Sequence, residues 1–233
     1  MFSSLPLFSH AKKLLQDGQD TAVSWIEEKP PASLLGSLAI LFLGVGVYGA
    51  SIGLWQGLEQ ACYVAIKLPF AILLTLLANG LLNGILASLL GVRLSFRETS
   101  LALLTSFAVF GLIVGSLSPI TMGMAFDAPA PDSPDGPDTH SRLLLTHTLL
   151  IAFAGIISTG RLYQVLRHFA DSDRAARHSL IGLLVGNLFA GAQISFLLRP
   201  IFGQPGLVIE FLRPDPFAGN FYESVWWAIT QNL

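Results

Sequence analysis

Hydrophobic positions along the chain gather into five long runs that contain no Asp, Glu, Lys or Arg. A helix of about 20 apolar residues, rising about 1.5 Å per residue, crosses a bilayer core of about 30 Å. We therefore predict an all-α fold, a polytopic transmembrane bundle of five helices over residues 34–198. The predicted spans are Leu34–Leu54, Leu68–Leu90, Leu101–Ile120, Leu143–Gly160 and Leu180–Leu198.

The residues before the first run interleave apolar and charged side chains, as helices on a membrane surface do. Gly18 interrupts this pattern, and Pro30 and Pro31 end it. Residues 1–33 are therefore predicted to be a cytoplasmic amphipathic segment of one or two short helices. A partly disordered tail is the alternative.

The residues after the last run contain too many prolines for one continuous helix and too many apolar side chains for a free tail. We expect residues 199–233 to fold as a cap outside the membrane, packed on the ends of the spans. The cap should end in a short interfacial helix at about residues 220–231, where Trp226 and Trp227 suit the headgroup layer.

Two of the connections carry specific expectations. Residues 55–66 are predicted to be a short loop. Residues 127–142 hold four prolines and four aspartates, which predicts an extended, solvated loop. A calcium site is the alternative there, but the spacing of Asp132, Asp135 and Asp138 differs from the alternation of an EF-hand.

Composition and charge agree with a membrane protein and predict its orientation. The chain is 52% hydrophobic and only 12% charged, and its net charge of −2 gives no indication of nucleic-acid binding. With a cytoplasmic N-terminus, nine cations lie on the cytoplasmic side and four on the outer side, as the positive-inside rule requires. The nine are Lys12, Lys13, Lys29, Arg93, Arg97, Arg161, Arg167, Arg174 and Arg177. We therefore predict that the N-terminus is cytoplasmic and the C-terminus is outside.

Small residues one helical turn apart let membrane helices approach closely. Such glycine pairs occur in four runs: Gly49/Gly53, Gly80/Gly84, Gly111/Gly115 and Gly182/Gly186. We expect close backbone contacts at the second and fourth pairs, within one bundle. A self-association face is the alternative.

Uncharged amides in the spans are candidates for a polar cluster, because an amide in hydrocarbon needs a partner. The candidates are Asn79, Asn83, Asn187 and Gln193. Interhelical hydrogen bonding and a polar path for a substrate or ion are both open.

Several residues near the proposed cap are candidates for contacts that hold it. Lys67 should reach the interface or pair with Glu59 or Glu210. Arg199 and Arg213 each occur in a Leu-Arg-Pro, and we expect at least one to donate to a carboxylate or to backbone carbonyls. Lipid phosphates are the alternative partners. The candidate cap residues are Lys67, Arg199, Glu210, Arg213, Asn220 and Glu223.

The sequence shows no pattern typical of an enzyme or a cofactor protein. Cys62 is the single cysteine, so an internal disulfide and a cysteine metal cluster are excluded. His147 is the only histidine within a span and has no second intramembrane ligand beside it, so no metal or haem is predicted. A P-loop, a dinucleotide glycine loop, a nucleophile elbow and a zinc motif are absent.

Two stretches resemble the bacterial branch of the Yip family. The first carries Lys67, Pro69, Leu89-Leu90-Gly91, Leu94-Ser95 and Arg97. The second, more distinctive, carries Gln193, Leu198-Arg199-Pro200, Gly203, Pro205, Phe211, Arg213-Pro214 and Asn220-Phe221-Tyr222-Glu223. The resemblance covers about residues 67–225. It implies five spans in a bacterial inner membrane, a cytoplasmic N-terminus and a C-terminus on the far side. No catalytic residue is implied. The GTPase binding of eukaryotic relatives is not carried over.

Three functions compete at this point. The first is a non-catalytic scaffold or organiser that recruits a protein partner or forms a homo-oligomer. The second is an oligomeric channel or transporter, with its path lined by the amides of spans 2 and 5. The third is a lipid-modifying enzyme, for which no residue constellation exists. A closed amide cluster would favour the scaffold, and a continuous polar lumen would favour conduction.

Overall fold

The computed structural model describes residues 6–16, 18–28, 31–89 and 92–231, with the side chains of 81–89 outside that description. The described residues form helices, with no strand among them. Five helices are long and apolar enough to cross a membrane, which confirms that part of the predicted fold. They are α3 (Pro31–Gly53), α4 (Leu58–Leu89), α5 (Phe96–Asp127), α6 (Gly136–Phe169) and α7 (Asp173–Leu197).

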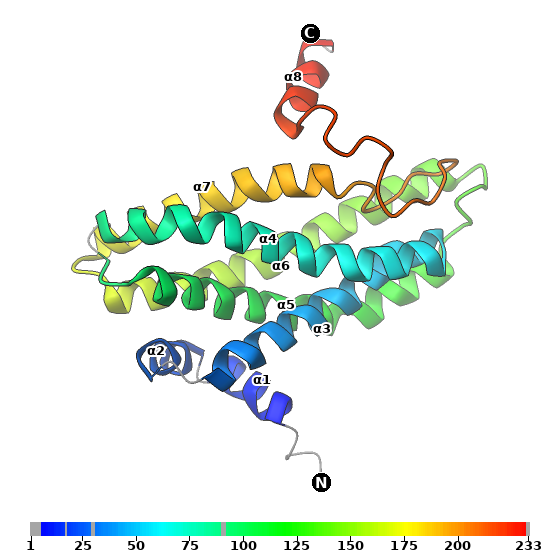
Figure 1. Ribbon diagram of the computed structural model, residues 1–233. Helices are drawn as coiled ribbons and strands as arrows, with labels where there is room; N and C mark the ends of the chain where they lie inside the picture. The colour runs from blue at the N-terminus through cyan, green and yellow to red at the C-terminus, as the bar shows by residue number, and fades with distance from the viewer. Residues whose placement is uncertain (1–5, 17, 29–30, 90–91, 232–233) are drawn as a thin grey trace.

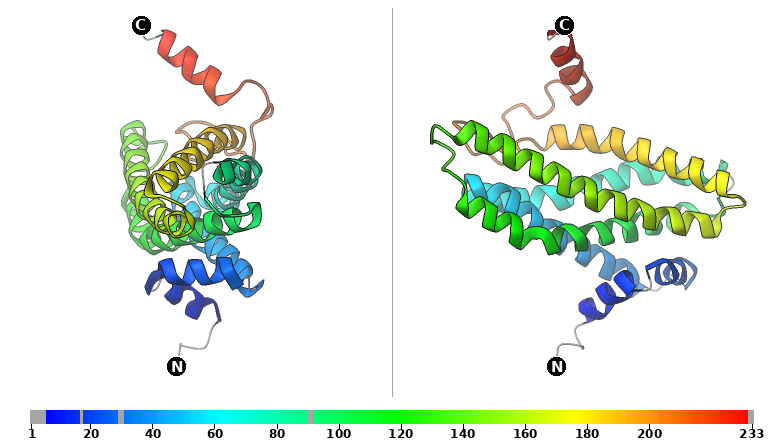
Figure 2. Two further views of the ribbon diagram at one scale, coloured as in Figure 1. Left: turned by 90° about the vertical axis from the view of Figure 1, so that its left-hand side faces the viewer. Right: turned by 180° about the vertical axis from the view of Figure 1, so that it is seen from behind.

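The five long helices run side by side along one direction, and the shorter helices flank them (Figure 1). Near the N-terminus, α1 (Pro6–Gln16) and α2 (Gly18–Glu28) lie on one side of the bundle. Near the C-terminus, α8 (Phe221–Gln231) projects from the opposite side (Figure 2). Residues 198–220, called the tail below, connect α7 to α8 without regular secondary structure.

All five long helices begin before the uncharged runs that predicted them, and two of these earlier starts replace predicted loops. A short 3-10 helix, η1 (Leu54–Gln56), is followed by α4 from Leu58, so residues 55–66 are mostly helical rather than a loop. Likewise α6 starts at Gly136 with a proline in its first turn, so the predicted loop 127–142 is extended only in its first part. The absence of charge marks the part of a helix that suits lipid, whereas helical hydrogen bonding continues into polar flanks.

The proline within α4 is accommodated by a glycine of α3. Pro69 has no N–H, so the carbonyl of Ala65 lacks its usual helical partner. A Cβ at Gly46 would lie only 3.3 Å from that carbonyl oxygen. The small residue lets α3 pass close to the interrupted turn.

Caps and polar contacts fix the connections at one end of the bundle. Ser95 and Glu98 form a capping box at the start of α5, and Ser172 accepts a hydrogen bond from the Ala175 N–H at the start of α7. The two connections are joined, because Arg93 Nε donates to Asp171 at 2.8 Å and its backbone N–H donates to Phe169. Five cations lie in or beside these connections: Arg93, Arg97, Arg167, Arg174 and Arg177.

The closest backbone contacts of the bundle involve α3. A Cβ at Gly44 would lie 2.2 Å from the carbonyl oxygen of Gly111 in α5, and one at Gly49 would lie 2.6 Å from that of Val64 in α4. At Gly80, in contrast, the nearest atoms are side-chain atoms of Ser100 and Phe96. Gly80 therefore does not make the close backbone contact predicted for it. The close contacts lie along α3, where glycines let α4 and α5 approach. The environment of Gly84 lies outside the described side chains, and the contact at Gly182 stays a prediction.

The five helices differ in how much of their surface the protein covers. In the most apolar 18-residue stretch of each helix, 56% is buried within the chain in α5, but only 17% in α6 and 11% in α7. Leucine, isoleucine and phenylalanine side chains of α6 and α7 lie on the surface of the chain. These two helices therefore present a broad apolar face.

Candidate functional site

One amide of α4, Asn79, and one of α7, Asn187, are hydrogen-bonded to each other. Asn79 is 1% exposed, and its amide nitrogen donates to the side-chain oxygen of Asn187. Gly186 makes room for this contact, because a Cβ there would lie 2.7 Å from the Asn79 oxygen. The side chain of Asn83 lies outside the described residues, so its role stays a prediction.

The fourth candidate amide, Gln193, belongs to a different contact. Its side-chain oxygen accepts a hydrogen bond from the backbone N–H of Phe221 at 3.0 Å, at the start of α8. Asn220 caps the same helix by accepting from the N–H of Glu223 at 2.9 Å. The Tyr222 hydroxyl donates to the carbonyl of Phe189 in α7. The candidate residues Gln193, Asn220 and Glu223 therefore all lie where α8 begins, and they anchor it to α7.

Lys67 is buried beneath the tail. It is 1% exposed, and its ammonium group donates to the carbonyl of Pro200 at 2.7 Å. The Phe211 ring lies 5.1 Å from the same nitrogen, a distance suited to a cation–π contact. Among the described residues no carboxylate pairs with Lys67, and Glu59 instead accepts from the Tyr63 hydroxyl. The contact with Pro200 takes the place of the expected ion pair, and the interfacial position of Lys67 stays a prediction.

Gln60, about two turns before Lys67 on α4, also holds the tail. Its amide nitrogen donates to the carbonyl of Ile201 at 3.0 Å, and the residue is fully buried. Sequence reasoning missed this residue, since a glutamine within the predicted loop 55–66 gave no sign of burial. Together Lys67 and Gln60 bind two successive carbonyls of the tail, at Pro200 and Ile201.

The two arginines of the tail are held by backbone carbonyls. Arg213 donates through one nitrogen to Pro216 and Ala218, both at 2.8 Å, and Arg199 Nε donates to Phe196 at 3.1 Å. Both guanidinium groups also lie over the Phe196 ring, with carbon-to-centroid distances of 3.5 Å for Arg199 and 4.7 Å for Arg213. Burial and the neighbouring Arg213 cation lower the pKa of Arg199. No carboxylate forms an ion pair with either arginine in the described part of the chain.

These contacts enclose a cleft of about 990 Å³ between the tail, the end of α7 and the starts of α4, α6 and α8. Its polar lining includes Gln56, Gln60, His140, Arg199, Glu210 and Arg213. The remaining walls are mainly apolar, with Phe196, Leu144 and Leu207 among them. The candidate residues Glu210, Arg199 and Arg213 thus meet in one cleft, although they are not paired with one another.

A second buried polar contact joins α3 to α6. His147 is 3% exposed, and its Nδ1 lies 3.0 Å from the Tyr48 hydroxyl. The Phe202 ring of the tail packs against the same imidazole at 5.9 Å. Tyr48 thus gives one ring nitrogen of the histidine a hydrogen-bond partner inside the bundle. Sequence reasoning missed Tyr48 because a tyrosine in an apolar run is common.

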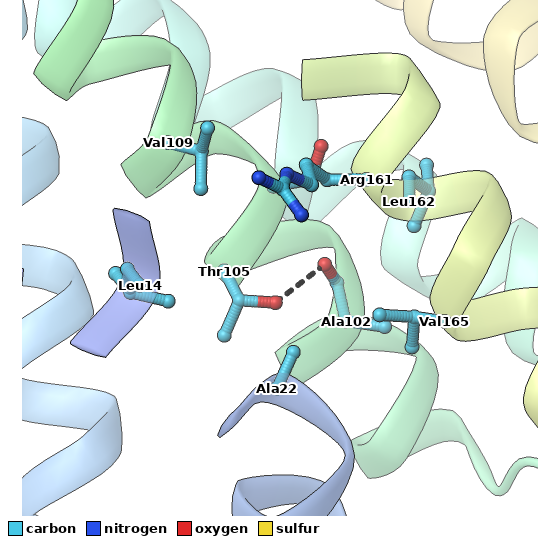
Figure 3. A pocket seen from close by; sticks show the side chains of 9 residues that line it. Leu14, Ala22, Ala102, Thr105, Val109, Arg161, Leu162 and Val165 are labelled. Atoms are coloured by element: carbon cyan, nitrogen blue, oxygen red, sulfur yellow. Dashed lines mark hydrogen bonds between the residues drawn. The ribbon is translucent and has the colours of Figure 1, made fainter. Parts of the chain in front are cut away.

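The N-terminal helices pack on the bundle through apolar side chains. Figure 3 shows Leu14 of α1 and Ala22 of α2 facing Thr105 and Val109 of α5 and Val165 of α6. The space left between them is about 10 Å³, enough for about one water molecule. This contact is therefore a packed junction rather than a ligand cavity.

Within the described residues, no group of three or more His, Cys, Asp or Glu side chains lies close enough to hold a metal ion. Comparisons with protein-family profiles, curated proteins and solved structures find no match to this chain.

Proposed function

We propose that this chain is a non-catalytic integral membrane protein, a scaffold or organiser of the Yip type in a bacterial inner membrane. The observation that carries the proposal is the hydrogen bond from Asn79 to Asn187, which pairs the two amides with each other across α4 and α7. A path for ions or polar substrates would need amides that face an open lumen. The resemblance of residues 67–225 to bacterial Yip proteins supports the same reading.

In the proposed orientation the N-terminus is cytoplasmic and the C-terminus is outside. The bias of nine cations to four favours this arrangement. We further propose that α1 and α2 rest on the cytoplasmic membrane surface and that the tail and α8 form an outer cap. The exposed Trp226 and Trp227 of α8 suit the headgroup layer.

The surface that recruits a partner is proposed to include the apolar faces of α6 and α7. Only 17% and 11% of their most apolar windows are buried within the chain. A second copy or another membrane protein would cover part of these faces, and lipid would cover the rest.

Labelling of single cysteines tests the orientation. In a Cys62→Ser background, we introduce Asp132→Cys at one end of the bundle and Arg174→Cys at the other, both at exposed positions. A membrane-impermeant maleimide added to intact cells should label the first and spare the second until the cells are opened. The reverse pattern would overturn the orientation.

Flux from liposomes that contain the purified protein separates a scaffold from a channel. We expect no release of trapped potassium or chloride above that of protein-free vesicles. Asn79→Leu should keep the fold, since an interhelical hydrogen bond in a membrane contributes only about 0.6–2 kcal/mol. Flux in the parent that disappears in a folded Asn79→Leu protein would overturn the scaffold proposal in favour of conduction.

A further inference from the structure

The cleft beneath the tail combines fixed positive charge with polar atoms that have no partner in the protein. Arg213 Nε, Gln56 Nε2 and Gln60 Oε1 are buried without a hydrogen bond. Gln60 is 0% exposed and lines the cleft. Buried polar groups normally find a partner, so such atoms around one cavity point to a ligand that supplies both acceptors and a donor.

The charge in the cleft favours an anion. The carbonyls of Phe196, Pro216 and Ala218 orient the arginines without neutralising them, and the terminal nitrogens of Arg199 have no partner in the described protein. Glu210 is the one carboxylate in the lining, so two cations face a single negative charge. A planar guanidinium group matches the geometry of phosphate oxygens.

The walls and the position of the cleft favour a lipid over a soluble anion. Apolar side chains form most of the lining, and Leu207 and Val208 are 64% and 79% exposed. The tail, which lines the cleft, lies at one end of the helices that are long enough to span a membrane (Figure 1). An acyl chain could lie along these walls while the headgroup meets the arginines.

We propose that this cleft binds a membrane phospholipid, with Arg199 and Arg213 holding its phosphodiester group and the apolar wall holding an acyl chain. Gln60 Oε1 accepts a hydrogen bond from a headgroup donor. The site rests on the proposed membrane location of the chain, but not on its orientation or on the absence of conduction. Binding measured in detergent therefore succeeds or fails separately from the labelling and flux experiments.

Native mass spectrometry of the delipidated full chain in detergent tests the site. Dihexanoyl phosphatidylglycerol should bind saturably with one molecule per chain. Arg199→Gln should weaken this affinity at least tenfold, while Arg142→Gln, an exposed arginine at the same end of α6, should leave it unchanged. Equal binding by the parent and by a folded Arg199→Gln protein would overturn the proposal.

A second variant covers the case in which Arg199→Gln loosens the tail. Leu207→Glu adds a carboxylate at an exposed position of the lining, where little packing is lost, and should also weaken binding at least tenfold. Parent-like affinity in this variant would overturn the site.

Two further ligands identify what is recognised. Glycerol 3-phosphate should bind at least tenfold more weakly than the phospholipid, and equal affinity would overturn the acyl-chain part of the proposal. A cationic dialkyl lipid without phosphate should not compete, and effective competition would overturn the role of the phosphodiester.

Discussion

The chain packs onto its own bundle in two places, and they use opposite kinds of contact. At the N-terminal junction, α1 and α2 lie on α3, α5 and α6 through buried apolar side chains, with about 10 Å³ left between them. At the C-terminal junction, Lys67 and Gln60 of α4 bind carbonyls of the tail, and a cleft of about 990 Å³ remains.

The difference shows how the two segments can be suited to different tasks. Apolar packing gains stability from area and close fit, so it leaves no room for a ligand. Hydrogen bonds from buried donors hold a backbone only at particular carbonyls. The residues between and beyond these carbonyls need not pack against the bundle. The C-terminal junction is therefore the one that can accept a ligand, while the N-terminal junction is a structural contact.

The largest effect is expected for truncation at the N-terminal junction. Leu14 is 1% exposed, and Leu14→Ala should weaken the junction by about 2–5 kcal/mol through lost burial and a new cavity. Hydrogen exchange of the α1 and α2 amides should accelerate while exchange in α5 stays slow. The matched control is Leu15→Ala, because Leu15 is 52% exposed. Equal acceleration in both variants would show that this junction does not depend on the buried side chain.

A smaller effect is expected at the C-terminal junction. Lys67→Met keeps the aliphatic stem but removes the hydrogen bond to Pro200, a contact from a charged donor that is worth roughly 1.5–3 kcal/mol. Protease cleavage within residues 198–220 should become faster, and the N-terminal junction should be unaffected. Lys12→Met, at an exposed lysine, serves as the control. A tail as resistant as that of the parent would mean that the lysine contributes nothing to its position.

The sequence predicted the helices better than their contacts. The uncharged runs were sufficient to place five spans, because a bilayer core demands long apolar helices whatever the neighbours are. Pro200, Pro214 and the tryptophans of α8 predicted an irregular segment that ends in a helix, and α8 occupies residues Phe221–Gln231. The start of α4 was missed because Glu59 and Gln60 are polar, although polarity does not prevent helix formation.

Pairing between distant residues could not be predicted from the chain alone. Asn79 and Asn187 were both candidates, but their contact depends on α4 and α7 lying side by side. Tyr48 and His147 are separated by 99 positions, and neither is distinctive without the other. The cleft has the same origin: it exists because the tail folds back over α4, which no local pattern specifies.

The smallest effect expected is a pH response of the N-terminal junction. The His10 ring stacks on Trp25 with a centroid distance of 4.0 Å, and Gly36 of α3 leaves the space that it occupies. Burial, followed by the charge of Lys13, lowers the pKa of His10 below 6.5, against a smaller opposing effect of a hydrogen bond with the Ser33 backbone. The folded junction therefore favours the neutral ring.

The sign of the response follows from that preference. Stabilisation by neutral His10 should be fully present above about pH 6.5 and lost as the pH falls through the lowered pKa of the folded state. The emission of Trp25, in a variant whose other three tryptophans are replaced by Phe, should shift to the red on acidification as the junction opens. His10→Phe keeps a flat ring and removes the titrating group, so its emission should stay constant over the same range. A red shift of equal size in His10→Phe would assign the response to another group and leave the N-terminal junction governed by apolar packing alone.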